Sequence, residues 1–423
     1  MKTPRVLIIS NQCLSQSSSN GRTLGNLLNG WPKEQLAQFC VIAKDPDWNL
    51  CDNYYCLEDR TVLHSFLHQI KAIGRKLIKE NGSNNAIETK PSGMRRKTLL
   101  KVFLRELVWS NKRWNSKCFK SWVADFNPNV VVLQFGDTFF TLDIAYEIAT
   151  IKNIPLVIYN TEGYYFFPRN WHHQSILDKL LFPIYKGIYS KKVERVMDIA
   201  KHCVYLNDKL KNDYDHIFGC SSTVIYNSSS IEPSDLPFFI GKYPKFCYLG
   251  NLGLDRDSAL VEIGEVLLSI NREYAIDVYG NADDHVRQRL ISAPGVNYCG
   301  LVSYEDVKNI ISESDILFHV ETEKGYKERQ LQYAFTTKIA DSVSSGRCFL
   351  VYAPDELACS SYIKYHKCGW TASSKEELRK VIISILSDEK IRTETIGYAK
   401  DVAVRNHNLQ VNAQSFQNIL LTV

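Results

Sequence analysis

The sequence has no uncharged apolar run of about 18 residues, the length that a membrane-spanning helix needs. In its opening stretch, MKTPRVLIIS, the apolar part is too short for the core of a signal peptide and is typical of a first β-strand. The twelve cysteines include no C-x-x-C pair and no spacing of a disulfide framework. We therefore expect a cytoplasmic chain with reduced thiols that does not span a membrane.

Short repeats, low-complexity tracts and the nucleotide-binding fingerprints G-x-G-x-x-G and the P-loop are also absent. What is present is the composition of a soluble globular protein, with 45% hydrophobic and 23% charged residues. A chain of 423 residues is too long for one ordinary core, so we expect two domains.

Short β-branched runs alternate with stretches of helical period along the chain. The runs are RVLIIS, FCVIAK, VVVLQF, PLVIYN, CVYLN and TVIYN in the first half, and KFCYLGN, AIDVYG, VNYCG, ILFHV and CFLVYA in the second. Continuous apolar strands separated by helices predict parallel sheets that are covered on both faces. We predict an α/β protein with two Rossmann-like domains that face each other across a cleft.

The alternation breaks at NSSSIEPSDLPFFIGKYP, which is rich in Ser, Pro and Gly. We therefore predict an N-terminal domain over 1–228, a linker over 229–243 and a C-terminal domain over 244–399. A helix over about 400–423 is expected to pack back on the N-terminal domain. In sheets of this kind, ligands bind at the carboxyl ends of the strands.

A glycine-rich strand end in the second half is suited to bind a phosphate. The stretch YLGNLGLDRDSAL, residues 248–260, ends a strand, turns through Gly250, Asn251 and Gly253, and opens a helix. Glycines let backbone N–H groups approach a phosphate, and the helix dipole favours the anion. The guanidinium of Arg256 has the fork geometry that matches phosphate oxygens. The alternative is an ordinary strand–turn–helix corner with a surface arginine.

Two further strand ends follow, DVYGNADD and VNYCGLVSYEDV. Tyr279 and Gly280 end the first, and Gly300 and Leu301 end the second. Both glycines permit close approach of a ligand, and the backbone just after Gly300 is placed to meet a base edge. We therefore expect these strand ends to contact a nucleotide.

The ordered motifs of residues 245–370 resemble the nucleotide-binding half of the GT-B glycosyltransferases. They read YLGNLG…R, VYG, CG-x-V-S-x-x-x-V, SDILFHVE, TKIADSVSSG and FLVYAP. The resemblance is closest to glycosyltransferase family 4, including capsule and surface-polysaccharide enzymes whose corresponding segment reads roughly FSTKIxDYLASGxPIL. The N-terminal half resembles that family only in outline.

This resemblance implies retaining transfer from a UDP- or GDP-sugar, with no required metal or other cofactor. It implies that Arg256 and Lys338 hold the diphosphate and stabilise its charge as the glycosidic bond breaks. Thr336 and Thr337 would offer hydroxyl and N–H groups at a helix mouth, and Asp341 would bind a ribose hydroxyl. The alternative for Lys338 is a solvated lysine, although a lysine in a first turn opposes the helix dipole unless an anion compensates.

One position departs from the family pattern. The first glutamate of the family's pair should lie eight residues before Asp341, and that position is Tyr333. Glu321 follows directly on the strand ILFHV and is expected to reach the sugar or the cleft instead.

The first half is expected to bind the acceptor. Residues 9–31 form a polar loop that leads to a helix start at Gly21 and Arg22 and is suited to fold over the cleft, with a plain surface loop as the alternative. Glycosyl transfer needs an acceptor hydroxyl near the anomeric carbon, usually helped by a carboxylate or the leaving phosphate. Glu162, just before the aromatic run YYFF, and Asp137 are the candidates; an N-cap acid beside core aromatics is the alternative.

Positive charge gathers in residues 71–120, where there are fourteen Lys and Arg and three acids. Within this segment and just beyond it, residues 93–122 carry Trp109, Trp114 and Trp122 and an apolar stripe of helical period. This pattern predicts a helix that lies on an anionic inner leaflet with aromatic anchors. One alternative is that the stripe packs on the domain and the charges are solvated. Nucleic acid is another, which the fold class argues against.

Metal-binding patterns are weak. The Asp-x-Asp sequences at 45–47 and 255–257 match that of metal-dependent glycosyltransferases of another fold but lack its sequence context. His64 and His68, and the pair at 172–173, lack a clustered third ligand. We expect no metal site.

The leading interpretation is a glycosyltransferase that builds a cell-surface glycan on a glycan or lipid-linked acceptor. A nucleotide-sugar epimerase of the same two-domain shape is one alternative. A degenerate glycosyltransferase-like subunit that scaffolds a partner is another. Tyr333 and Asp341 in place of the usual pair favour the scaffold, and the presence of both Arg256 and Lys338 opposes it.

Overall fold

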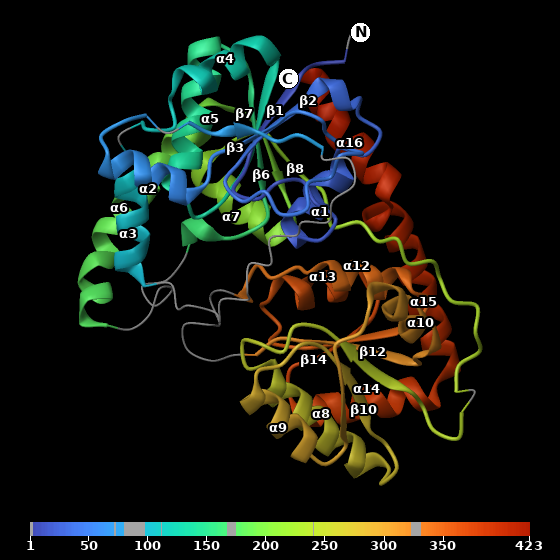
Figure 1. The fold of residues 1–423 in the computed structure, drawn as a ribbon. Coiled ribbons are helices and arrows are strands. Elements are labelled where there is room, and N and C mark those ends of the chain that lie inside the picture. The colour runs from blue at the N-terminus through green and yellow to red at the C-terminus, as the bar shows by residue number, and fades with distance from the viewer. Residues whose placement is uncertain are drawn as a thin grey trace. The chain divides into compact units, whose positions relative to one another are not determined.

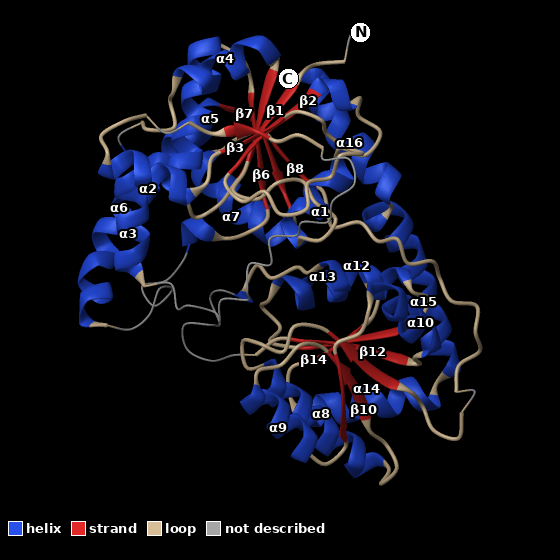
Figure 2. Cartoon of the chain, in the orientation of Figure 1, coloured by secondary structure: helices blue, strands red, loops and turns tan. Residues whose placement is uncertain are grey.

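The computed structural model describes residues 3–71, 73–79, 98–110, 112–166, 175–239, 241–322 and 331–423. The chain divides into two compact units. Unit 1 comprises Met1–Ile225 together with Ala413–Val423, and unit 2 comprises Tyr226–Asn412. In each unit, helices pack on both faces of a mainly parallel sheet (Figure 1, Figure 2).

Unit 1 is built on an eight-stranded sheet with the order β4-β3-β2-β1-β5-β6-β7-β8. Neighbouring strands are parallel except β3 and β4, which are antiparallel. The strands are β1 (Val6–Ile9), β2 (Leu36–Cys40), β3 (Tyr54–Cys56), β4 (Arg75–Lys76), β5 (Val130–Gln134), β6 (Leu156–Asn160), β7 (Ala200–Tyr205) and β8 (Ser222–Val224). The helices are α1 (Ser19–Leu27), α2 (Asp59–Leu67), α3 (Leu99–Ser110), α4 (Lys117–Phe126), α5 (Phe139–Lys152), α6 (Ile176–Ile199) and α7 (Asp208–Phe218), with 3-10 turns at Lys33–Gln35 and Tyr164–Phe166.

Unit 2 is built on a six-stranded, fully parallel sheet with the order β11-β10-β9-β12-β13-β14. Its strands are β9 (Phe246–Leu249), β10 (Ile276–Tyr279), β11 (Val296–Gly300), β12 (Ile316–Val320), β13 (Cys348–Tyr352) and β14 (Trp370–Ala372). The helices are α8 (Arg256–Ile270), α9 (Asp284–Ser292), α10 (Tyr304–Glu313), α12 (Thr337–Ser344), α13 (Ala358–His366), α14 (Lys375–Ser387) and α15 (Glu389–Val402). A π-helical turn at Ala403–His407 leads to α16 (Leu409–Thr422).

Both sheets share one strand order around their first strand. In unit 2 the strands lie across the sheet in the chain order 3-2-1-4-5-6, and unit 1 repeats this order from β3 to β7 with one added strand at each edge. The residues of β1, VLII, and of β13, CFLVY, are all buried, as expected for parallel sheets covered on both faces. The predicted pair of Rossmann-like domains is confirmed.

Several predicted boundaries differ from the structure. β2 begins at Leu36, before the predicted run FCVIAK, because the pairing of β2 with β1 starts there, with Leu36 opposite Val6. The division between units falls after Ile225, ahead of the predicted linker 229–243, and Ser229 of that segment is hydrogen-bonded within unit 2. The predicted helix over 400–423 is interrupted by the π-helical turn and by Asn408.

The end of α16 contributes core side chains to unit 1. Phe416 is 0% exposed, and its ring centroid lies 6.3 Å from that of Tyr159 on β6. Leu420 belongs to the same core cluster, together with Val6 of β1. Unit 1 is therefore assembled from two segments that are separated in the sequence by the whole of unit 2.

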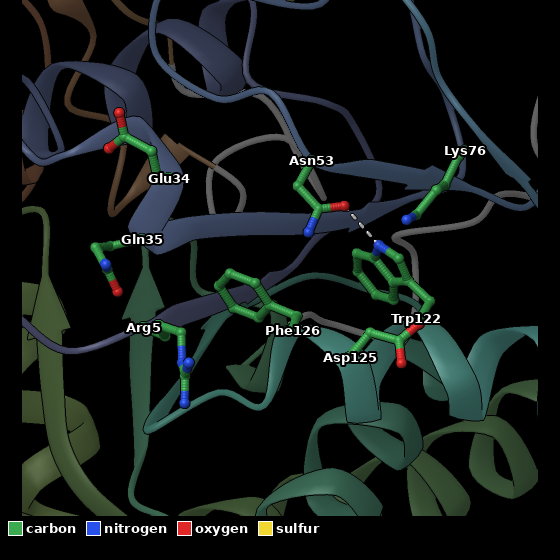
Figure 3. A pocket seen from close by; sticks show the side chains of 8 residues that line it. All are labelled: Arg5, Glu34, Gln35, Asn53, Lys76, Trp122, Asp125 and Phe126. Atoms are coloured by element: carbon green, nitrogen blue, oxygen red, sulfur yellow. Dashed lines mark hydrogen bonds between the residues drawn. The ribbon is translucent and has the colours of Figure 1, made fainter.

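At the amino edge of the unit 1 sheet, residues just before β1, β2 and β3 and the last turn of α4 line a hollow (Figure 3). All twelve cysteines are free thiols. Among the helices of the described residues, none is at once long enough and apolar enough to cross a membrane.

Candidate functional site

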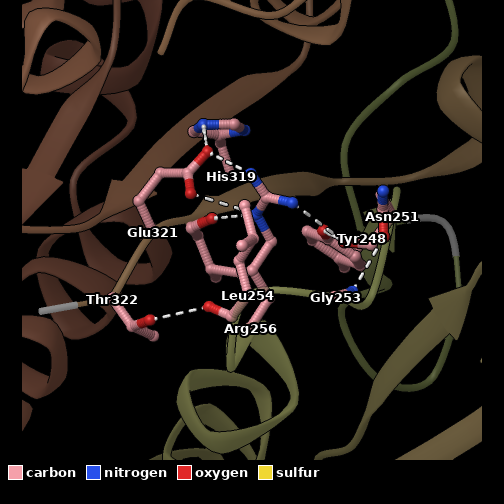
Figure 4. Close-up of polar contacts among 9 residues, drawn as sticks. Tyr248, Asn251, Gly253, Leu254, Arg256, His319, Glu321 and Thr322 are labelled. Carbon is pink, nitrogen blue, oxygen red and sulfur yellow. Dashed lines mark hydrogen bonds and ion pairs between the residues drawn. The ribbon is translucent and has the colours of Figure 1, made fainter. Parts of the chain in front are cut away.

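In unit 2 the strand order reverses between β9 and β12, and the residues that follow these two strands meet there (Figure 4). Arg256 is the first residue of α8, which follows β9, and Glu321 directly follows β12. Open α/β sheets bind ligands at this point, outside the carboxyl ends of the strands.

Arg256 and Glu321 form a buried ion pair with two parallel hydrogen bonds. Arg256 donates through Nη2 to Glu321 Oε1 at 2.8 Å and through Nε to Oε2 at 3.1 Å. The two residues are 7% and 2% exposed. Both carboxylate oxygens thus accept hydrogen bonds from Arg256, and Glu321 orients the guanidinium. The expected reach of Glu321 towards the sugar or the cleft stays a prediction.

His319 lies beside this ion pair. It precedes Glu321 by two residues on β12, so both side chains leave the strand on the same side, and its Nε2 lies 3.3 Å from Glu321 Oε1. Burial raises the pKa of Glu321, but His319 and Arg256 outweigh this effect and the net shift is downward. His319 was not among the residues predicted from the sequence. The signal that would have found it is a histidine in an apolar strand, two residues before an acid.

The turn between β9 and α8 is fixed by its own polar groups. The side chain of Asn251 accepts a hydrogen bond from Gly253 N at 2.8 Å, and Thr322 Oγ1 donates to Leu254 O at 2.9 Å. Asp255, the N-cap of α8, has a φ of 60° and does not cap the helix with its side chain. A helix start of this kind is suited to bind an anion.

Glycine is required where the turns after β9 and β10 touch. A Cβ on Gly280 would lie 2.0 Å from Gly250 O. The amide of Gly250 donates to Tyr279 O at 2.9 Å, and that of Gly280 donates to Gly300 O at 2.8 Å. Leu301 is 77% exposed just beyond. These predicted binding residues therefore lie together along the carboxyl edge of the sheet.

Helix α12 of unit 2 begins with three of the predicted diphosphate-binding residues. Its N-cap is Thr336, and the buried Oγ1 of this residue has no hydrogen-bond partner in the part of the chain that the structure describes. Thr337 is the first helical residue, and Lys338 follows it, partly buried. Burial and the positive charge of Arg256 lower the pKa of Lys338 to about 8, against the opposing effect of nearby carboxylates. A bound anion would stabilise both cations.

The remaining two positions of the family motif in unit 2 are Asp341 and Tyr333. Asp341 Oδ1 accepts a hydrogen bond from Ser229 Oγ at 2.7 Å. Tyr333 is 3% exposed, so this position offers a buried phenol where the family pattern has a carboxylate. The ribose contact expected of Asp341 stays a prediction.

Unit 1 has its own strand-order reversal, between β1 and β5. Ser18 is the N-cap of α1 and accepts a hydrogen bond from Gly21 N at 3.2 Å. A Cβ on Gly21 would lie 2.5 Å from Cys13 O, so the loop after β1 packs closely on the helix. Arg22 follows in the same turn and Asp137 follows β5, both partly buried.

Glu162 follows β6, the next strand of the sheet, and its side chain is exposed. Its amide donates to Asn160 Oδ1 at 3.1 Å. The aromatic run after it packs within unit 1, where the rings of Tyr165 and Phe166 lie 6.2 and 5.0 Å from that of Tyr214. Phe167 lies outside the described residues. Glu162 as a whole is exposed, but the protein around its carboxyl raises the pKa of that group to about 7 by desolvation. The two aromatic rings contribute to packing.

The described histidine pair, His64 and His68, belongs to no metal-binding group of described residues. The ring centroids of His64 on α2 and His68, the C-cap of that helix, lie 4.2 Å apart. Residues 172–173 lie outside the described part of the chain. Among the described residues, no group of three or more His, Cys, Asp or Glu side chains is arranged to hold a metal ion. The expectation that the protein needs no metal stays a prediction.

No protein-family model matches the sequence, and no curated protein matches it significantly. Solved structures do match. HepE from Anabaena in complex with UDP has a TM-score of 0.64 and 10% identity, over 99% of this chain and 100% of that one. Sucrose-phosphate synthase from Thermosynechococcus elongatus has a TM-score of 0.59 and 11% identity, over 99% and 98%. WaaG, a glycosyltransferase involved in lipopolysaccharide biosynthesis, has a TM-score of 0.54 and 11% identity, over 99% and 100%.

The chain has the GT-B fold. Because each likeness spans 99% of the chain, both units belong to this fold, and the predicted fold class is confirmed. Within the GT-B fold, the assignment to family 4 stays a prediction.

Proposed function

We propose that the chain is a retaining, metal-independent glycosyltransferase that moves a sugar from a nucleotide-diphosphate donor to a glycan or lipid-linked acceptor. We place it in cell-surface polysaccharide synthesis in the cytoplasm. The observation that carries the proposal is the buried guanidinium of Arg256, oriented by Glu321 beside the strand-order reversal of unit 2, together with Lys338 in the first turn of α12. The GT-B fold, which it shares with enzymes of this reaction class, supports it.

The chemistry of the leaving group explains why these residues are needed. Negative charge grows on the diphosphate as the glycosidic bond breaks. Arg256, held in place by Glu321, and Lys338, at the start of α12, are the two cations that would stabilise this charge. The Oγ1 of Thr336, which has no partner among the described residues, would donate to a phosphate oxygen. On the acceptor side, Glu162 is the candidate carboxylate, and burial raises the pKa of its carboxyl to about 7.

UDP is the first donor nucleotide to test. HepE structures hold UDP and UDP-glucose, and the fold likeness is supporting evidence for a similar donor here. WaaG is involved in lipopolysaccharide biosynthesis, which supports the proposed role in surface glycans.

A scaffold without catalytic activity is the second candidate. Two observations favour it: Asp341 is already hydrogen-bonded to Ser229, and the charge of Arg256 is already neutralised by Glu321. Such a subunit would bind a nucleotide weakly or not at all, and it would not transfer a sugar.

Thermal stabilisation by UDP, GDP and inorganic phosphate tests donor binding. We expect one diphosphate to stabilise the wild type, and Lys338→Ala to weaken its binding by about 10- to 100-fold, the range for a charge-assisted hydrogen bond. Lys380→Ala removes an exposed lysine of α14 and is the matched control that should bind normally. Sugar release from UDP-glucose then separates the enzyme from the scaffold. No stabilisation by any of these compounds would contradict the enzyme.

We also propose that unit 1 binds an anionic membrane surface through α3 and α6. These helices lie side by side, with the ring of Phe103 6.0 Å from that of Tyr185 (Figure 1). Large apolar side chains are exposed along both helices at helical spacing: Leu100, Leu104 and Leu107 on α3, and Ile176, Leu180, Ile184 and Ile188 on α6. Exposed Lys101, Lys179 and Lys191 accompany them, which is the combination that anionic lipid attracts.

The prediction that three tryptophans anchor this surface in the membrane is wrong. Trp109, Trp114 and Trp122 are between 1% and 3% exposed. The ring of Trp109 stacks on Phe140 at 3.9 Å, and Trp122 Nε1 donates to Asn53 Oδ1 at 2.7 Å. These tryptophans pack in the core of unit 1, and Trp122 also lines the hollow at the amino edge of its sheet. Residues 93–97 lie outside the described part of the chain.

A further inference from the structure

A hollow of about 380 Å³ opens at the amino edge of the unit 1 sheet (Figure 3). Three adjacent parallel strands each contribute the residue just before their start: Arg5 before β1, Gln35 before β2 and Asn53 before β3. The hollow therefore lies at the opposite edge of the sheet from Asp137 and Glu162, which follow strands. Its volume is within the range of about 300–1,000 Å³ that small-molecule sites occupy.

Aromatic rings from the last turn of α4 give the hollow an apolar side. Trp122 and Phe126 line it, and Figure 3 shows them between Arg5 and Gln35 on one side and Lys76 on the other. The hydrogen bond from Trp122 Nε1 to Asn53 Oδ1 fixes the indole. Rigid, preplaced rings of this kind bind the apolar face of a ligand without further ordering.

The polar groups of the hollow are positioned but only partly satisfied. Arg5 is fixed by its backbone amide, which donates to Asn129 Oδ1 at 2.8 Å, and by Nε, which donates to Asn127 O at 2.8 Å. The Oε1 atom of Gln35 is buried and has no hydrogen-bond partner within the described ranges. A buried carbonyl oxygen without a donor is unfavourable, so a ligand hydroxyl that donates to it would be stabilised.

The charges around the hollow indicate the class of ligand. Arg5 and Lys76 are balanced by Glu34 and Asp125, which also line it. Two carboxylates disfavour a polyanion such as a diphosphate, and two cations disfavour a cationic ligand. Hydroxyl groups both donate and accept hydrogen bonds, so they match carboxylate, amide and guanidinium groups together.

We propose that this hollow binds a neutral saccharide, with Phe126 and Trp122 as the apolar part of its wall and Gln35 and Arg5 as partners for its hydroxyls. The inference rests on the proposed function: the saccharide is a part of the acceptor or product glycan away from the point of transfer. A second binding site for the glycan raises the effective concentration of the glycan at the enzyme without a new contact at the reacting atoms.

Saturation-transfer-difference NMR with cellobiose, maltose and lactose tests the proposal on the full chain. We expect at least one of these disaccharides to bind the wild type and to bind about fivefold more weakly to Gln35→Ala, the loss of one neutral hydrogen bond. Arg5→Ala should weaken binding at least as much. Gln288→Ala, on the exposed side of α9 in unit 2, is the matched control and should bind as the wild type does.

Thermal stabilisation by UDP, measured on the same variants, separates this inference from the proposed function. The stabilisation should be equal in the wild type and in all the variants, because none of the substitutions touches the proposed donor site. Equal saccharide affinity in the wild type, Gln35→Ala and Arg5→Ala would overturn the inference, as would binding of none of the three disaccharides. Phosphate binding that disappears in Arg5→Ala would also overturn it, in favour of an anion site. None of these results would change the UDP measurement.

Discussion

Removing the carboxylate of Glu321 is expected to destabilise unit 2 more than removing both members of its ion pair. Glu321→Ala leaves the guanidinium of Arg256, which is 7% exposed, without its contacts at 2.8 and 3.1 Å. Loss of one partner of a buried ion pair costs about 3–5 kcal/mol. In a unit of this size, 1 kcal/mol lowers Tm by about 2–4 °C, so the expected fall in Tm is on the order of 10 °C.

Scanning calorimetry on Arg256→Met, Glu321→Ala and the double variant forms the cycle that tests this reasoning. The double variant should be more stable than Glu321→Ala alone, because it leaves no buried charge unpaired. The coupling between the two positions should be about 1–3 kcal/mol. Strictly additive effects, or a Glu321→Ala variant with an unchanged Tm, would refute the account of the pair.

The same pair predicts a pH dependence with a definite sign. The pKa of Glu321 is lowered in the folded protein, because His319 and Arg256 together outweigh its burial. The stabilisation from the ionised pair is therefore fully present above the unfolded-state pKa of about 4.3 and is lost as the pH falls through the folded-state value. The stability advantage of the wild type over Glu321→Ala should shrink in that acidic window and stay constant at neutral pH.

Three further outcomes are expected. Because burial and Arg256 lower the pKa of Lys338 to about 8, UDP affinity measured by calorimetry should fall as the pH rises above about 8 in the wild type but not in Lys338→Arg. Gly280→Ala should lower Tm, since its Cβ would lie 2.0 Å from a carbonyl oxygen, whereas Gly397→Ala, with open space around its Cβ on α15, should stabilise by up to about 1 kcal/mol. Ile184→Asp should abolish salt-resistant cosedimentation with anionic vesicles at unchanged Tm, while Ile291→Asp, on α9, should not; these side chains are 56% and 58% exposed.

The sequence predicted the elements whose signal is local. The buried run VVVLQF and the motifs YLGNLG…R and TKIADSVSSG each consist of residues that are near one another in the chain. The structure has strand β5 at the first, the start of α8 at the second and the start of α12 at the third. Strands β3 and β14 have only three residues each, too few for an alternation or an apolar run to be recognised.

What the sequence did not predict depends on contacts across the fold. Glu321 meets Arg256 only because β9 and β12, far apart in the chain, are neighbours in the sheet. The helical period around Trp109 marks an apolar stripe but does not say which side of α3 another element covers. Periodicity fixes the angular position of a side chain, whereas burial depends on what packs against it.

The core position of Phe416 has a consequence for the order in which the protein is made. A ribosome synthesises residues 413–423 only after the whole of unit 2, yet Phe416 and Leu420 lie in the same cluster as β1 and β6. The hydrophobic core of unit 1 therefore stays incomplete until these residues are made, whereas unit 2, which is contiguous in the chain, can fold first. During translation the apolar surface beside Tyr159 is left uncovered, and this is the surface that a nascent-chain chaperone would protect.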